Sequence, residues 1–234
     1  MISSVPKNKA AAGKRLVSSP TLPLIYDKLY QNFGPQHWWP GDTRLEIIVG
    51  AILTQNTNWG NVEKAIANLK KARALDLNIL HRMPADKLAQ LIRPSGYFNV
   101  KAKRLKNFVT FLMKEYQGSL SRLSREPLEV LREKILGVNG IGKETADSIL
   151  LYAFNKPIFV IDAYTKRILT RHFFLKQEEA DYDTMQALFT AHIKKDVPLY
   201  NEFHALIVMT GKNYCKPKAR CEKCPLNGLP HSKG

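Results

Sequence analysis

The chain has 234 residues, 44% of them hydrophobic, which is enough for a sizeable core in one large domain or two interlocked lobes. Lysine and arginine total 36 against 20 acidic residues, and the formal charge of +16 favours a polyanionic partner over a merely solubilising basic surface. No apolar run approaches the ~20 residues of a membrane-spanning helix, and neither a secretory signal nor a disulfide scaffold is expected.

The N-terminal stretch, residues 1–20, carries four basic residues and no acid. This composition is typical of an organelle transit peptide and also of a disordered tail that contacts DNA transiently. We favour the disordered tail. A short helix over 26–33 follows. The loop after it, GPQHWWPGD, holds two adjacent tryptophans. An apolar segment with helical spacing then covers 43–55, and Thr43 or Asp42 can cap it.

The remaining pattern is helical almost throughout, and we predict an all-α protein. The expected helices cover 61–69, 75–80, 84–92, a basic helix ending near 115, 127–136, 143–154, 163–174, 181–194 and 198–211. Only 157–161 has any strand character. We interpret the basic positions of the long helix as a solvated face; they are Lys101, Lys103, Arg104 and Lys106.

A glycine turn, Gly140-Ile141-Gly142, opens directly onto the helix 143–154. Glycines let the backbone approach a phosphate closely, and the first amides of a helix lack internal partners. We therefore expect the amides of Val138, Gly140 and Gly142, with Lys143, to hold a nucleic-acid phosphate. The apolar segment PIFVID ends at Asp162, eighteen positions after Glu144.

Four ordered blocks carry a family resemblance: ILTQNTNW at 52–59, SGYFNVKA at 95–102, GVNGIGKETAD at 137–147 and VIDAYTKR at 160–167. They resemble the helix-hairpin-helix DNA glycosylase superfamily, which includes endonuclease III. The resemblance implies two α-helical lobes with a DNA-binding cleft between them. The two-lobed domain would cover 21–214, with a middle lobe at about 44–145, an outer lobe from the N- and C-terminal helices, and a cysteine-containing loop at 215–234.

Within that superfamily, the runs WWP, QNT, RPSG and GKE resemble the small bacterial 3-methyladenine DNA glycosylases of the endonuclease III type. Endonuclease III has its Schiff-base lysine where this chain has Glu144. Lys143 is adjacent, but one step along a helix turns a side chain by ~100°. The resemblance thus implies a monofunctional DNA glycosylase that removes a damaged base, an alkylated purine, from double-stranded DNA without cutting the strand.

Asp162 is the expected catalytic residue. A carboxylate beside the sugar would stabilise the oxocarbenium-like state left by base loss, and it can orient or deprotonate the attacking water. The alternative is that Asp162 caps the helix beginning at Ala163, and both roles can hold together. Gln55 resembles the family's residue that fills the gap left by the flipped nucleotide; a buried polar cap is its alternative.

An extruded base needs aromatic faces, and Trp38, Trp39 and Trp59 are the only tryptophans. A cationic base over an indole gains ~0.5–2 kcal/mol. The alternative is that these rings pack a lobe interface. Glu144 would form a wall of the base pocket, although a carboxylate in the first turn of a helix is favoured by the helix dipole anyway.

Cys215, Cys221 and Cys224 form C-x5-C-x2-C, which resembles the C-terminal [4Fe–4S] motif of endonuclease III. The fourth cysteine is missing, and Pro230 and His231 stand near its place. Three options stay open: a cluster with His231 or an outside ligand, a Cys3His zinc site, or a loop without metal.

The chain is thus expected to be a monomer that acts in the cytoplasm at the nucleoid, with DNA and no membrane as partner. Two rivals remain. One is an endonuclease III-like glycosylase and lyase that acts on oxidised pyrimidines; the other is a DNA-binding module that cuts nothing.

Overall fold

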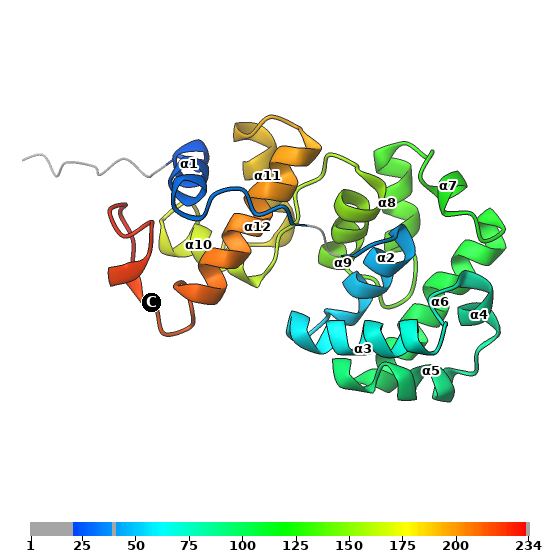
Figure 1. The fold of residues 1–234 in the computed structure, drawn as a ribbon. Helices are drawn as coiled ribbons and strands as arrows, with labels where there is room; N and C mark the ends of the chain where they lie inside the picture. Colours follow the sequence, from blue (N-terminus) through cyan, green and yellow to red (C-terminus); the bar gives the residue numbers. More distant parts are fainter. Residues whose placement is uncertain (1–20, 39–40, 233–234) are drawn as a thin grey trace, which may run out of the picture.

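A computed structural model describes residues 21–38 and 41–232, so the N-terminal tail predicted for residues 1–20 lies outside the described residues. The fold is all-α, as predicted, and the described ranges contain no strand. Figure 1 shows two groups of helices, with α1 and α10 to α12 on one side and α2 to α9 on the other. No helix in the described ranges is long and apolar enough to cross a membrane.

The first group follows the chain almost continuously from α2 to α9. Its elements are α2 (Arg44–Leu53), α3 (Trp59–Lys71), α4 (Leu77–Arg82), α5 (Ala85–Leu91), the 3-10 turn η1 (Arg93–Ser95), α6 (Phe98–Tyr116), α7 (Leu120–Leu123), α8 (Leu128–Leu136) and α9 (Lys143–Ser148). The four-residue helix α7 was not predicted, because so short a segment carries no periodicity to detect.

The second group joins the N-terminal helix to the C-terminal ones. It comprises α1 (Leu22–Phe33), α10 (Ala163–Arg171), α11 (Tyr182–His192), α12 (Val197–Asn213) and the 3-10 turn η3 (Cys221–Lys223). Between the groups runs η2 (Ile149–Ala153), a π-helical turn that continues α9 and packs against both α2 and α12. The predicted helix 143–154 is therefore an α-helix for its first half only.

The basic positions of α6 do not form a solvated face, and that interpretation is wrong for three of its four residues. Lys101 is 1% exposed, and its Nζ donates to the carbonyls of Leu53 (2.9 Å) and Ser95 (2.6 Å). Lys106 donates to carbonyls at the end of α4, and Arg104 donates to Gln55. These cations satisfy carbonyl and amide oxygens that would otherwise lack partners inside the protein.

A buried carboxylate on α9 connects the two groups. Asp147 is fully buried and accepts from Arg132 of α8 through Nε (2.7 Å) and Nη2 (3.0 Å). It also accepts from Tyr182 Oη (2.8 Å) and Gln186 Nε2 (2.7 Å) of α11. Gln186 donates in turn to the Phe159 carbonyl (2.7 Å), in the extended segment before α10. The second helix of the hairpin is therefore fixed to α8, to α11 and to that segment.

We expect Asp147→Asn to lower the free energy of unfolding by about 3 kcal/mol, because it leaves the Arg132 guanidinium without its anion. Urea unfolding followed by circular dichroism measures the change. Asp183→Asn is the matched control, since Asp183 pairs with Lys143 at the surface, where an ion pair contributes about 0–1 kcal/mol. Equal effects of the two substitutions would contradict the central role of Asp147.

Candidate active site

Asp162 ends the extended segment after η2 and is the N-cap of α10. Its Oδ1 accepts from the amide (2.7 Å) and the hydroxyl (2.8 Å) of Thr165, so the capping role expected from the sequence is present. The side chain is 12% exposed, and Oδ2 faces Nε2 of His204 at 3.8 Å. One carboxylate oxygen is thus fixed by the helix, while the other makes no hydrogen bond to the described residues.

Glu144 lies in the first turn of α9 and is open to solvent on one side. The protein around it and, second, the negative charge of Asp162 raise the pKa of its carboxyl to about 7. Two carboxyl groups close enough to interact therefore lie in different surroundings. Asp162 receives two hydrogen bonds from Thr165, whereas the carboxyl of Glu144 has a pKa raised to about 7.

The hairpin between α8 and α9 turns its backbone outward because its apolar side chains point inward. Val138 and Ile141 are each 6% exposed, and Gly140 has a φ of 93° that favours glycine. The amide of Val138 donates to the Ile135 carbonyl (3.1 Å), so it would have to give up this partner to hold a phosphate, and that role stays a prediction. Along the described chain, the amides of Gly140 and Gly142 have no partner and remain available to an anion.

Gln55 lies against this hairpin. Its Nε2 donates to the Gly140 carbonyl (3.1 Å) and to Thr145 Oγ1 (3.0 Å), and its Oε1 accepts from Arg104. Arg104 packs so tightly on Gly140 that a Cβ there would lie 2.3 Å from the Arg104 Cγ. In the protein without DNA, the half-buried Gln55 therefore has polar partners of its own. The side chain would have to exchange them to enter a duplex, and that role stays a prediction.

An exposed aromatic ring that the sequence reasoning missed is held near the same place. Tyr97 is 72% exposed and has a left-handed φ of 45° at the start of α6. Lys101 links its turn, through Ser95, to Leu53 at the end of α2, two residues before Gln55. The available signal was Gly96 directly before the aromatic pair, because a glycine marks a turn and turns lie at the surface.

The tryptophans have packing partners of their own. Trp38 is half-buried, and Lys212 Nζ lies 5.4 Å from its ring centroid. Trp59 is half-buried at the start of α3 and packs on α2, where a Cβ on Gly50 would lie 3.2 Å from its ring. Trp39 lies outside the described residues. A base-stacking role for these rings stays a prediction.

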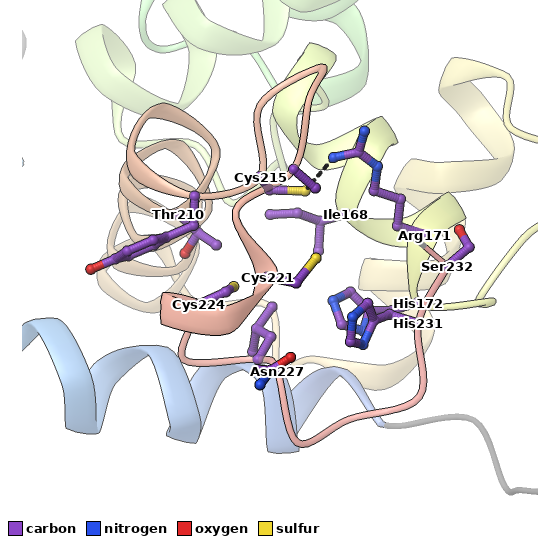
Figure 2. A pocket seen from close by; sticks show the side chains of 13 residues that line it. Ile168, Arg171, His172, Thr210, Cys215, Cys221, Cys224, Asn227, His231 and Ser232 are labelled. Carbon is purple, nitrogen blue, oxygen red and sulfur yellow. Dashed lines mark hydrogen bonds between the residues drawn. The ribbon is translucent and has the colours of Figure 1, made fainter. Parts of the chain in front are cut away.

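The three cysteines follow α12 and line one small cavity together with His172 and His231 (Figure 2). The space between these side chains is about 20 Å³, room for about one water molecule. No group of three or more His, Cys, Asp or Glu within residues 21–38 and 41–232 is placed to hold a metal ion. As these side chains are placed, they form no metal-ligand group, and the choice among a cluster, a zinc site and a metal-free loop stays a prediction.

Contacts from α10 hold this loop. Arg171 Nη1 donates to Cys215 Sγ (3.3 Å) and to the Lys216 carbonyl (2.7 Å), as Figure 2 shows for the sulfur contact. Arg167 Nε donates to the Cys215 carbonyl (2.6 Å), and the Ser232 amide donates to the Arg171 carbonyl (2.8 Å). Protein hydrogen bonds thus close the loop at both of its ends.

Residues 49–192 match the model of the HhH-GPD superfamily, described as a base excision DNA repair protein. A protein of Methanocaldococcus jannaschii named as a DNA repair glycosylase is 46% identical over 211 residues, 89% of this chain and 95% of its own. The structure of H. pylori 3-methyladenine DNA glycosylase bound to 1,N6-ethenoadenine is 33% identical, with a TM-score of 0.72, covering 82% of this chain and 98% of that one. A trapped endonuclease III–DNA covalent intermediate is 22% identical and shares the fold, with a TM-score of 0.76 over 90% of this chain and 95% of that one.

The loop predicts a proteolysis result. We expect Arg171→Ala to increase tryptic cleavage between residues 216 and 220, because it removes the donors that hold that segment. Cys221→Ser should leave cleavage unchanged, since the Cys221 thiol is not among the groups bonded to α10. Chelator-treated and untreated protein should behave alike. If chelator or Cys221→Ser exposes the loop as strongly as Arg171→Ala does, a metal holds it.

The carboxyl pair predicts a titration result. In protein with labelled glutamate, the Glu144 carboxyl should titrate near pH 7, and Glu144→Gln identifies its signal. Asp162→Asn should lower that pKa, because it removes a nearby negative charge, but burial should keep it above the ordinary glutamate value. An unchanged pKa in Asp162→Asn would show that the two carboxyl groups do not interact.

Proposed function

This chain belongs to the HhH-GPD superfamily and is a DNA glycosylase of base excision repair, and from that premise we propose that it excises an alkylated purine by hydrolysis without cutting the strand. One observation carries the proposal. The first turn of α9 presents a carboxyl, Glu144, that interacts electrostatically with the carboxylate of Asp162, and the amine of the adjacent Lys143 is paired with Asp183.

The proposed reaction breaks the bond between the sugar C1′ and the base nitrogen, and the bonding electron pair leaves with the base. The sugar becomes oxocarbenium-like, and the free Oδ2 side of Asp162 stabilises this charge. A water oxygen then bonds to C1′, and its proton passes to Asp162 and on to solvent. A base alkylated at a ring nitrogen is cationic and leaves as a neutral molecule, so the site needs no acid at the base.

The positive charge of the alkylated base also matches the carboxyl of Glu144, which we propose as a wall of the base pocket. Glu144 exchanges its proton near neutrality, so a cationic base beside it would favour the ionised carboxylate. Trp38, Trp39 and Trp59 are the rings we propose for stacking. The solved 3-methyladenine glycosylase with ethenoadenine bound supports this choice of substrate class, because a third of its aligned residues are identical to those of this chain.

We propose that DNA lies between the two groups of helices, which act as the two lobes of a monomer. The free amides of Gly140 and Gly142 would hold a phosphate, and Lys143 would add charge after releasing Asp183. Gln55 and Tyr97 would occupy the duplex around the extruded nucleotide. A protein with this substrate acts on the cell's DNA, which is the basis for placing it at the nucleoid in the cytoplasm.

The rival activity, strand cleavage through a Schiff base, requires an accessible amine at the site. Lys143 Nζ is paired with the Asp183 carboxylate. The other amine of interest, Lys101, has a pKa lowered by burial, but it is 1% exposed and donates to two carbonyls. Lys101 is enclosed, and Lys143 lies one helix position, ~100°, away from Glu144, which favours hydrolysis.

A panel of duplexes, each with one modified base, tests the proposal by measuring released base. We expect release of an alkylated purine, a loss of about 100-fold or more in Asp162→Asn, and unchanged binding of DNA by that variant. Asparagine can still cap α10, so the fold should survive. Asp181→Asn is the matched control, because Asp181 caps α11 through Thr184 in the same way.

Borohydride trapping separates the rival. No covalent DNA adduct should form with the unmodified protein, and an adduct lost in Lys143→Ala would establish the lyase. Binding of damaged DNA without release of any base in the panel would instead establish a non-catalytic module.

A further inference from the structure

A buried histidine behind Asp162 has a ring nitrogen without a partner. His204 lies on α12 with its side chain 8% exposed, and its Nε2 is the buried side-chain atom in the described ranges that makes no hydrogen bond. Leaving such a group unpaired costs about 1–3 kcal/mol. The residues of α12 that directly follow His204 are apolar, and an aliphatic side chain at this position would avoid the cost of an unpaired nitrogen. The presence of an imidazole therefore requires an explanation.

The other ring nitrogen decides which tautomer is present. Nδ1 of His204 is in short contact with the hydroxyl of Tyr152, which lies on the π-helical turn η2. Burial raises the pKa of Tyr152 well above its usual value, so its hydroxyl keeps its proton and donates to Nδ1. A neutral imidazole then carries its own proton on Nε2, on the side of Asp162.

That N–H faces the oxygen of Asp162 which the helix cap leaves free. Oδ1 already accepts twice from Thr165, whereas Oδ2 lies 3.8 Å from Nε2. This separation is longer than a hydrogen bond by about 0.8 Å. Contacts of this kind often tighten only when the substrate is bound.

The surrounding groups favour a neutral donor. The titratable groups facing His204 are Tyr152 from η2 and Asp162 from the start of α10, and Glu144 of α9 lies beyond Asp162. The ring of Phe159 covers another side at 6.3 Å between centroids. Burial lowers the pKa of His204, although the charge of Asp162 opposes that shift.

We propose that His204 is a positioning residue, whose Nε2–H closes onto Oδ2 of Asp162 when DNA is bound and aims that carboxylate at the sugar. Tyr152 sets the tautomer that makes this possible. The inference rests on the proposed catalytic role of Asp162. It adds a chain of three side chains, drawn from η2, α12 and the start of α10, which together orient the reacting oxygen.

Two substitutions of similar size distinguish positioning from packing. In His204→Gln, the longer amide can reach the place of Nε2 and donate to Asp162. In His204→Asn, the amide ends near the place of Nδ1 and cannot reach Asp162. Tyr152→Phe removes the donor that fixes the tautomer. Thermal unfolding and binding of a duplex with an abasic-site analogue confirm that each variant is folded and binds DNA.

The readout is the single-turnover rate of 3-methyladenine release from methylated duplex DNA. We expect His204→Asn to lose about 10- to 100-fold, the effect of removing a hydrogen bond to a charged group. His204→Gln should recover most of the rate, because its amide can still donate to Asp162. Tyr152→Phe should fall between the two.

Equal rates for His204→Asn and His204→Gln would overturn the inference, as would a rate of His204→Asn equal to that of the unmodified protein. Asp162→Asn, measured in parallel, separates this failure from a failure of the proposed function. If Asp162→Asn still releases base, the catalytic assignment itself is wrong. If Asp162→Asn is inactive while both His204 variants match the unmodified protein, only the role of His204 is wrong.

Discussion

The carboxylate of Asp147 is the constraint on which the site depends. It is fully buried and accepts four hydrogen bonds, two from Arg132 and one each from Tyr182 and Gln186. A buried anion with so many partners tolerates little displacement of any of them. Gln186 also donates to the Phe159 carbonyl. The hairpin helix and the segment leading to Asp162 are therefore both held by the Asp147 carboxylate and its partner Gln186.

Because these elements are held rigidly, the carboxyl groups of Asp162 and Glu144 keep different surroundings although they interact with one another. Asp162 accepts from a helix amide and a hydroxyl, while the protein around Glu144 and the charge of Asp162 raise the pKa of the Glu144 carboxyl. Enzymes commonly separate acid and base roles through the surroundings of two groups and not through residue type. In this protein the two carboxyl groups differ because only Asp162 receives hydrogen bonds from the helix that it caps.

Local signals in the sequence predicted the helices and the hairpin well, because caps, glycines and apolar spacing act over a few residues. Thr43 and Asp162 cap helices as their positions suggest. The buried cations of α6 could not be predicted in this way, since Lys101 meets carbonyls 48 and 6 positions away and only the fold brings them together. His204 was overlooked for the same reason, because a lone histidine among apolar residues resembles ordinary core and its partner Tyr152 is 52 positions distant.

The π-helical turn η2 has a consequence for how this arrangement could arise in evolution. Each hydrogen-bonded loop of a π-helix contains one residue more than that of an α-helix. Deleting a single codon within residues 149–151 would restore regular helix and rotate the following side chains, Tyr152 among them, by ~100°. Tyr152 would then no longer meet His204. The phenol–imidazole contact is therefore one insertion or deletion event from being gained or lost, and homologues that differ in helix length here should differ in both residues together.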